Sequence, residues 1–85
     1  MDINVPDAFS PNGDGKNDVL LVEGLAPENE VYVFDRQGKK VFEAINYRNN
    51  WSPSPDELAD GFYVCIVKSA GKTFKHSLII KRSTF

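Results

Sequence analysis

Cysteine is nearly absent from this sequence, which excludes two common ways of stabilising a small domain. The single Cys65 can form neither an intramolecular disulfide nor a zinc site built from several thiolates. It lies in the apolar run 62–67, where we expect a buried and unreactive thiol. A chain of 85 residues buries only about 60–65% of its unfolded surface, so one well-packed core is needed.

A large net charge and long apolar runs are also missing. The formal charge is −2, and no basic stripe alternates with aromatic side chains, so nucleic acid is not an expected partner. No apolar run is long enough to cross a bilayer as a helix. Met1 and Asp2 form no basic or apolar leader, and we expect the domain to be a module of a longer protein.

Patterns that mark enzymes are missing as well. His76 is the only histidine, and its alternation with Phe74 and Leu78 favours a place on a strand face over a role as metal ligand or general base. No Gly-x-Ser-x-Gly elbow occurs, and Gly13-Asp14-Gly15 lacks the Gly-Lys-Ser/Thr sequence that completes a phosphate-binding loop. We therefore expect no catalysis and no small-molecule substrate.

What the sequence does contain is a strong alternation of apolar and polar residues. Its 41% hydrophobic and 12% aromatic content is typical of a globular domain, and no stretch has the period of an amphipathic helix. The alternation predicts strands at residues 19–25, 30–35, 40–44, 62–68 and 73–82.

The segments between these strands carry turn residues. Arg36 and Gly38 lie in a short turn that predicts a hairpin between strands 30–35 and 40–44. Residues 45–61 contain prolines that cannot join a central strand, so this segment should be irregular, with Tyr47 and Trp51 folded back onto the core edge. Together the elements predict an all-β fold, a small antiparallel immunoglobulin-like β-sandwich of roughly six or seven strands. We expect one domain over residues 1–85, and a monomer.

The loop before the first predicted strand is the densest cluster of turn-forming and acidic residues. Side-chain oxygens that could bind calcium come from Asn12, Asp14, Asn17 and Asp18. An EF-hand is excluded, because Leu21 occupies the position of the bidentate glutamate. A loop closed by hydrogen bonds from these side chains to its own backbone is the favoured interpretation, and bound calcium is the alternative.

Four blocks of the sequence resemble one known family in the right order. Residues 5–18 carry its Pro-Asn-Gly-Asp-Gly loop, and residues 31–43 are similar to its "F-(N/D)-R-W-G-x-x-V-(F/Y)" block, with Gln37 in place of tryptophan. Tyr47 and Trp51 match its "Y…W" segment, and residues 58–64 resemble "L-P-D-G-T-Y-x-Y". The chain thus resembles the gliding motility-associated C-terminal domain, the type B sorting domain of type IX secretion substrates in Bacteroidetes.

The resemblance implies a non-catalytic C-terminal signal that directs its cargo through the type IX secretion system by protein–protein recognition. It implies export through the periplasm to the cell surface or medium, with the translocon and outer-membrane shuttle proteins as partners. The residues assigned to recognition are Asn12, Gly13, Asp14, Gly15, Asn17 and Asp18, with the last strand as a docking edge. The alternative is a calcium-ordered adhesion or carbohydrate-binding module that uses Tyr47 and Trp51.

Overall fold

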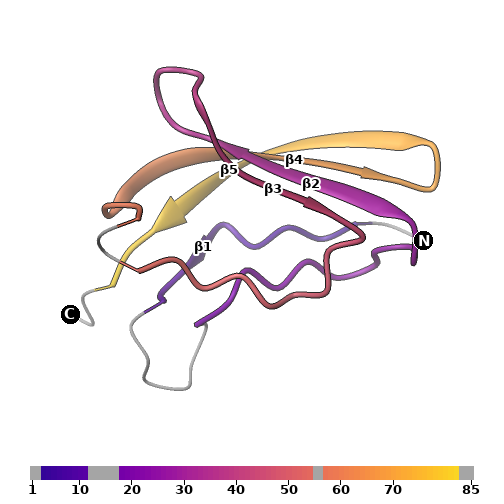
Figure 1. Cartoon of the computed structure of the whole chain (residues 1–85), viewed down its shortest axis with the longest axis horizontal. Coiled ribbons are helices and arrows are strands. Elements are labelled where there is room, and N and C mark those ends of the chain that lie inside the picture. Colours follow the sequence, from indigo (N-terminus) through magenta and orange to yellow (C-terminus); the bar gives the residue numbers. More distant parts are fainter. Residues whose placement is uncertain (1–2, 12–17, 55–56, 83–85) are drawn as a thin grey trace.

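A single five-stranded sheet dominates the fold (Figure 1). The computed structural model describes residues 3–11, 18–54 and 57–82. Its strands are β1 (Ala8–Phe9), β2 (Asn29–Phe34), β3 (Lys40–Ile45), β4 (Gly61–Ser69) and β5 (Lys72–Ile80), in the order β1-β5-β4-β2-β3. The all-β prediction is confirmed, and no helix capable of spanning a membrane occurs in the described part.

Two antiparallel hairpins supply four of the strands, as their sequences predict. In β2 the alternation is complete: Val31 and Val33 are fully buried, whereas Tyr32 is half-buried on the other face. The hairpin of β4 and β5 closes through Ala70 and Gly71, which both have positive φ. Those φ values are what a two-residue type I′ turn requires. β2 and β4 pair with each other, so they form the centre of the sheet.

The sheet is mixed, which corrects the expectation of a purely antiparallel fold. The short β1 runs parallel to β5, with Ala8 opposite Ile79 and Phe9 opposite Ile80. Two residues are too few to show an alternation, and the pairing joins segments far apart in sequence. Periodicity cannot reveal such a strand.

Residues 19–25 do not form the predicted strand. Leu20 and Val22 are buried and Leu21 is exposed, so the alternation is present, but only Glu23 makes a bridge, to Asn4. The reason lies in the neighbouring segment 46–54. Its Asn46 and Asn49 have positive φ, and its Pro53 lacks the N–H that a ladder needs.

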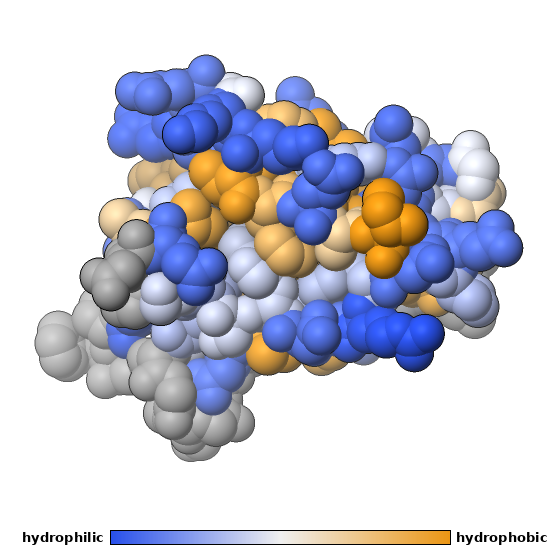
Figure 2. Space-filling model, viewed as in Figure 1, coloured by the Kyte–Doolittle hydropathy of each residue, from blue (hydrophilic) through white to orange (hydrophobic). Residues whose placement is uncertain are grey.

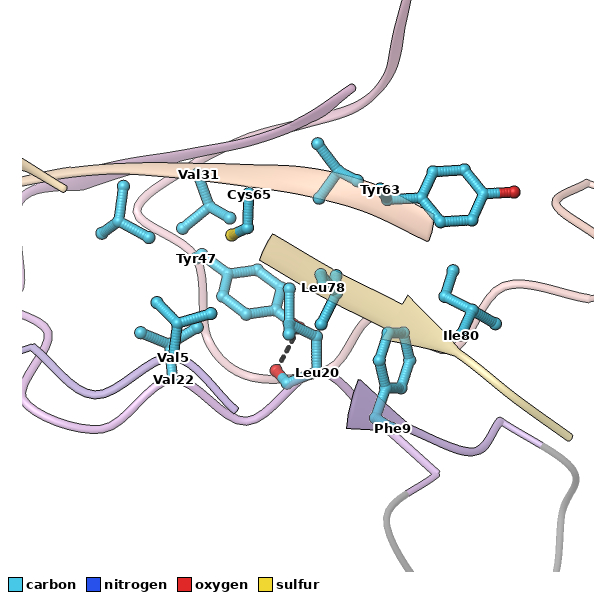
Figure 3. Packing of buried hydrophobic residues seen from close by; sticks show 12 residues of the cluster. Val5, Phe9, Leu20, Val22, Val31, Tyr47, Tyr63, Cys65, Leu78 and Ile80 are labelled. Carbon is cyan, nitrogen blue, oxygen red and sulfur yellow. Dashed lines mark hydrogen bonds between the residues drawn. The ribbon is translucent and has the colours of Figure 1, made fainter. Parts of the chain in front are cut away.

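The core lies between the sheet and a layer of extended segments, 3–11, 18–28 and 46–54. In Figure 3, Val31, Cys65 and Leu78 point from the sheet toward Val5 and Val22 of that layer. The layer is irregular, so the described residues contain five strands in one sheet, fewer than the six or seven expected for a sandwich. The buried apolar cluster consists of Val5, Phe9, Leu20, Val22, Val31, Val33, Tyr47, Tyr63, Cys65, Val67, Leu78 and Ile80.

The last strand is only partly an edge strand. β5 ends at Ile80, two residues before the predicted end, and its C-terminal residues are covered by β1. The prediction of an open docking edge is therefore wrong for Ile79 and Ile80. The beginning of the strand pairs with β4 alone, so its other edge is open, and docking there stays a prediction.

Candidate recognition surface

Most of the predicted recognition loop lies outside the described residues. Only Asp18 is described, and it is half-buried. The loop residues that fall outside are Asn12, Gly13, Asp14, Gly15 and Asn17.

Both ends of that loop are held by Trp51, one through its ring and the other through its backbone carbonyl. On the N-terminal side the ring of Phe9 lies 5.8 Å from that of Trp51, and Pro11 is buried. On the C-terminal side the N–H of Leu20 donates to the carbonyl of Trp51 at 3.0 Å. Since Phe9 and Leu20 are both buried, the base of the loop is fixed to the core.

Calcium binding stays a prediction. Three of its four candidate ligands, Asn12, Asp14 and Asn17, lie outside the described residues. Within the described ranges no group of three or more His, Cys, Asp or Glu side chains is placed to hold a metal ion.

The hairpin turn is built on the carboxylate of Asp35. One of its oxygens accepts the N–H groups of Gln37 and Lys39, both at 2.9 Å. The N–H of Gly38 donates to the Asp35 carbonyl at 3.0 Å, and its φ of 87° is readily adopted by glycine. Arg36 is exposed at the tip, so the predicted turn pair of Arg36 and Gly38 is placed as expected.

Tyr47 lies inside the molecule and cannot serve as a flat platform for a sugar. It is 5% exposed, its hydroxyl donates to the Leu20 carbonyl at 2.7 Å, and the same oxygen accepts the Trp51 N–H at 3.0 Å. Burial raises the pKa of Tyr47 to about 12, against the effect of the Trp51 donor. Trp51 stacks on Phe42 with centroids 4.1 Å apart. The sugar-binding role considered for this pair is therefore wrong for Tyr47.

The contacts of Arg82 with Asp60 and Pro53 were not predicted from the sequence. Its guanidinium donates to the Asp60 carboxylate at 2.8 Å and to the Pro53 carbonyl at 3.0 Å, and its backbone N–H also reaches Asp60. These donors, the backbone N–H first, lower the pKa of the Asp60 carboxyl. The Arg82 side chain is only 12% exposed, so it joins the end of β5 to the turn before β4 and to the irregular layer. The Asp-Gly pair at 60–61 marks the turn, but nothing in the sequence pairs it with Arg82.

His76 and Cys65 occupy the places expected of them. His76 is half-buried on β5, with Nε2 at 2.8 Å from the exposed carboxylate of Asp7. Cys65 is fully buried in β4, and desolvation raises the pKa of its thiol to about 11. A protonated, inaccessible thiol is chemically inert, as predicted.

The face of the sheet turned away from the core is mixed in character. Phe62 is 61% exposed there, and the ring of Tyr32 lies between the Nζ atoms of Lys40 and Lys68, each 5.8 Å from its centroid. A shallow hollow of about 430 Å³ is lined by Tyr32, Phe34, Gly38, Lys40, Ile66 and Lys68. Figure 2, which views the molecule as Figure 1 does, shows apolar side chains as separate patches among hydrophilic ones. Patches of this kind are ordinary on a monomer.

Comparison with family models decides what kind of domain this is. The CHU_C type IX secretion signal domain matches residues 3–81, nearly the whole chain. The chain belongs to this family. The resemblance found in the sequence is thereby confirmed. Membership of the type IX secretion signal domains implies a secretion-signal role, interaction with the type IX machinery, and export to the cell surface or the extracellular space. No curated protein matches the sequence significantly.

Proposed function

We propose that residues 1–85 form a single, non-catalytic C-terminal sorting domain, recognised in its folded state. It carries its cargo through the periplasm to the type IX translocon and its outer-membrane shuttle proteins. The observation that carries the proposal is the type IX secretion signal match over residues 3–81. Recognition works through protein–protein contacts, so the site is a surface.

We assign recognition to the loop 12–18 and to the last strand. The attachment of both loop ends to the core at Trp51 supports this assignment. A loop with a fixed base loses less conformational entropy on binding than a freely moving one. Arg36 and Gly38, in the hairpin turn, are a secondary contact.

The test is export of a fluorescent cargo that carries a signal peptide and residues 1–85. The host is a Bacteroidetes strain, compared with its translocon-deficient mutant. We expect fluorescence at the surface or in the medium of the first strain only. Cargo that stays in the periplasm of both strains, with the domain folded, would overturn the proposal.

Loop variants then test the site. The variant with Asp14, Gly15, Asn17 and Asp18 all replaced by Ala should reduce export while the domain keeps its melting temperature. The matched control replaces two exposed acidic residues elsewhere, Glu28→Ala and Glu43→Ala. Equal export of both variants would remove the loop from the recognition surface and leave the sorting role intact.

A further inference from the structure

The first half of β5 presents an open backbone edge. The N–H of Ile79 donates to the Asp7 carbonyl at 2.8 Å, so the backbone groups of Ile79 point away from β4. Residues two apart in a strand point the same way. Thr73, Lys75 and Ser77 therefore turn their N–H and C=O groups toward this same edge. Within the described ranges no backbone hydrogen bond reaches them there.

The edge is open because the N-terminal segment leaves it. Pairing with β5 begins at Asp7, directly after Pro6, which has no N–H to donate. Further back, Asn4 exchanges two backbone hydrogen bonds with Glu23, at 2.9 and 3.0 Å, in the layer across the core. Figure 1 shows the chain running from β1 to the N-terminus below the strands of the sheet. The edge therefore has room for another strand.

An apolar hollow lies beside this edge, on the core side of the sheet. It has a volume of about 340 Å³. Ile3, Leu25 and Phe74 supply its apolar wall, and Lys72 stands among its lining residues. A strand added at Thr73–Ser77 would direct alternate side chains toward the hollow. Apolar residues at those alternate positions would suit it.

The other face of the edge is basic. Lys75 lies on the outer face of β5 and is exposed, as is Lys68, which pairs with Thr73 on the same face. Neither forms an ion pair with any described residue, and the same is true of Lys72. Acidic side chains on the added strand would complement Lys75 and Lys68 on this face, whereas Lys72 shares the face of Phe74 and lines the hollow.

Charge also argues against a second copy of the domain at this edge. An antiparallel pairing of two β5 edges centred on Lys75 would place lysine opposite lysine. Like charges directly opposite each other destabilise a sheet. The lysines thus disfavour self-association and favour an acidic strand.

We propose that the β5 edge from Thr73 to Ser77 binds an extended segment of a partner protein by strand addition. The segment has apolar residues toward the Phe74 hollow and acidic residues toward Lys75 and Lys68. The inference rests on the proposed sorting function, in which that partner is a component of the secretion machinery. It deepens that function by naming the chemistry of the recognised segment.

The experiment compares two proline variants in the export assay described above. Lys75→Pro removes an N–H that faces the open edge of β5 and breaks no bond to β4. Glu43→Pro is the matched control at the opposite edge, because by register the N–H of Glu43 also points outward, from β3. We expect Lys75→Pro to lower export by about tenfold or more and Glu43→Pro to leave it unchanged.

Charge reversal separates a lost contact from a lost fold. Lys68→Glu combined with Lys75→Glu keeps the backbone intact and should also lower export, with the melting temperature close to that of the wild type. Normal export of a folded Lys75→Pro domain, or of the charge-reversed domain, would overturn the edge proposal. Failure of wild-type export would instead overturn the sorting function.

A peptide measurement tests the same edge without export. The probe is a synthetic peptide of alternating glutamate and valine, and its control has lysine in place of glutamate. We expect the glutamate peptide to protect the amides of Thr73, Lys75 and Ser77 from hydrogen exchange, and the lysine peptide to protect none. Protection by both peptides, or at β3 instead, would contradict the proposal.

Discussion

At the scale of single residues, Tyr47 joins segments that no backbone ladder joins. Its hydroxyl is the only side-chain group shown to bridge the Leu20 carbonyl and the Trp51 N–H in the described part of the chain. Its own backbone N–H donates to the buried Asn29 side chain at 2.9 Å. The irregular layer is therefore fixed to the sheet partly through one phenol.

Tyr47→Phe should lower the free energy of unfolding by about 1–3 kcal/mol, because two buried backbone groups lose their partner. The comparison is Tyr32→Phe on the outer face, which loses only a solvent-accessible hydrogen bond to the Glu30 carboxylate and should cost clearly less. Urea denaturation measures both. Equal losses in the two variants would contradict this account of Tyr47.

The same phenol should make stability depend on alkaline pH. Its pKa is raised from 10.0 to about 12, so the unfolded chain releases the proton first. The stabilisation is complete below about pH 10 and is lost as the pH rises toward 12. Tyr47→Phe should therefore weaken the fall in stability between about pH 10 and about pH 12. An unchanged fall would show that the other groups with raised pKa values, Cys65, Tyr32 and Tyr63, dominate.

At the scale of the elements, strands with a full alternation are predictable from sequence. β2, β3 and β4 begin and end within one residue of the predicted positions, because each buries one face of a continuous ladder. The segment 19–25 misleads for a physical reason: alternation reports burial, and burial does not require strand pairing. Leu20 and Val22 are buried by a neighbour too irregular to form a ladder.

Sites made of residues far apart in the sequence could not be predicted from local patterns. The turn residues Arg36 and Gly38 could be placed, since the Asp35 carboxylate bonds to residues two and four positions along. The Arg82–Asp60 pair joins residues 22 positions apart, and the open edge of β5 depends on where Pro6 diverts the chain. Local sequence patterns predict neither the Arg82–Asp60 pair nor the open edge of β5.

Arg82→Ala should cost about 2 kcal/mol of unfolding free energy, because the charged hydrogen bonds that join β5 to Asp60 and Pro53 are lost. Arg82→Lys should recover only part of this loss, since a lysine cannot reproduce the planar fork of donors. Lys81→Ala, at the exposed neighbouring position, is the control and should change little. Chemical denaturation measures the series, and full rescue by lysine would refute the geometric argument.

At the scale of the whole molecule, the two sides of the core are ordered by different means. The sheet side is a continuous hydrogen-bonded ladder, and β4 pairs with β5 along its whole length and with β2 from Val64 to Ser69. The opposite side is held by scattered backbone contacts such as Leu20 to Trp51 and Asn4 to Glu23. The domain is therefore unevenly stable across its thickness.

Hydrogen exchange should reveal this asymmetry. Amides of β4 should exchange slowest, at the rate of global unfolding, and amides of residues 18–28 should exchange faster through local opening. The outward-facing amides of Glu43 and Lys75 should be faster still, because they lie at open edges. Residue-resolved NMR exchange measures these rates. Comparable protection of residues 18–28 and β4 would contradict the prediction.

The parallel pairing of β1 with β5 has a consequence for how the domain is made. Ala8 and Phe9 meet Ile79 and Ile80, about seventy positions further along the chain. As the chain emerges from synthesis or translocation, the early partner stays unpaired until the late one has also emerged. A nascent chain halted before residue 79 has nothing to pair with β1, whatever else has folded. Closure of the sheet thus coincides with completion of the domain sequence, and contacts of such long range fold slowly.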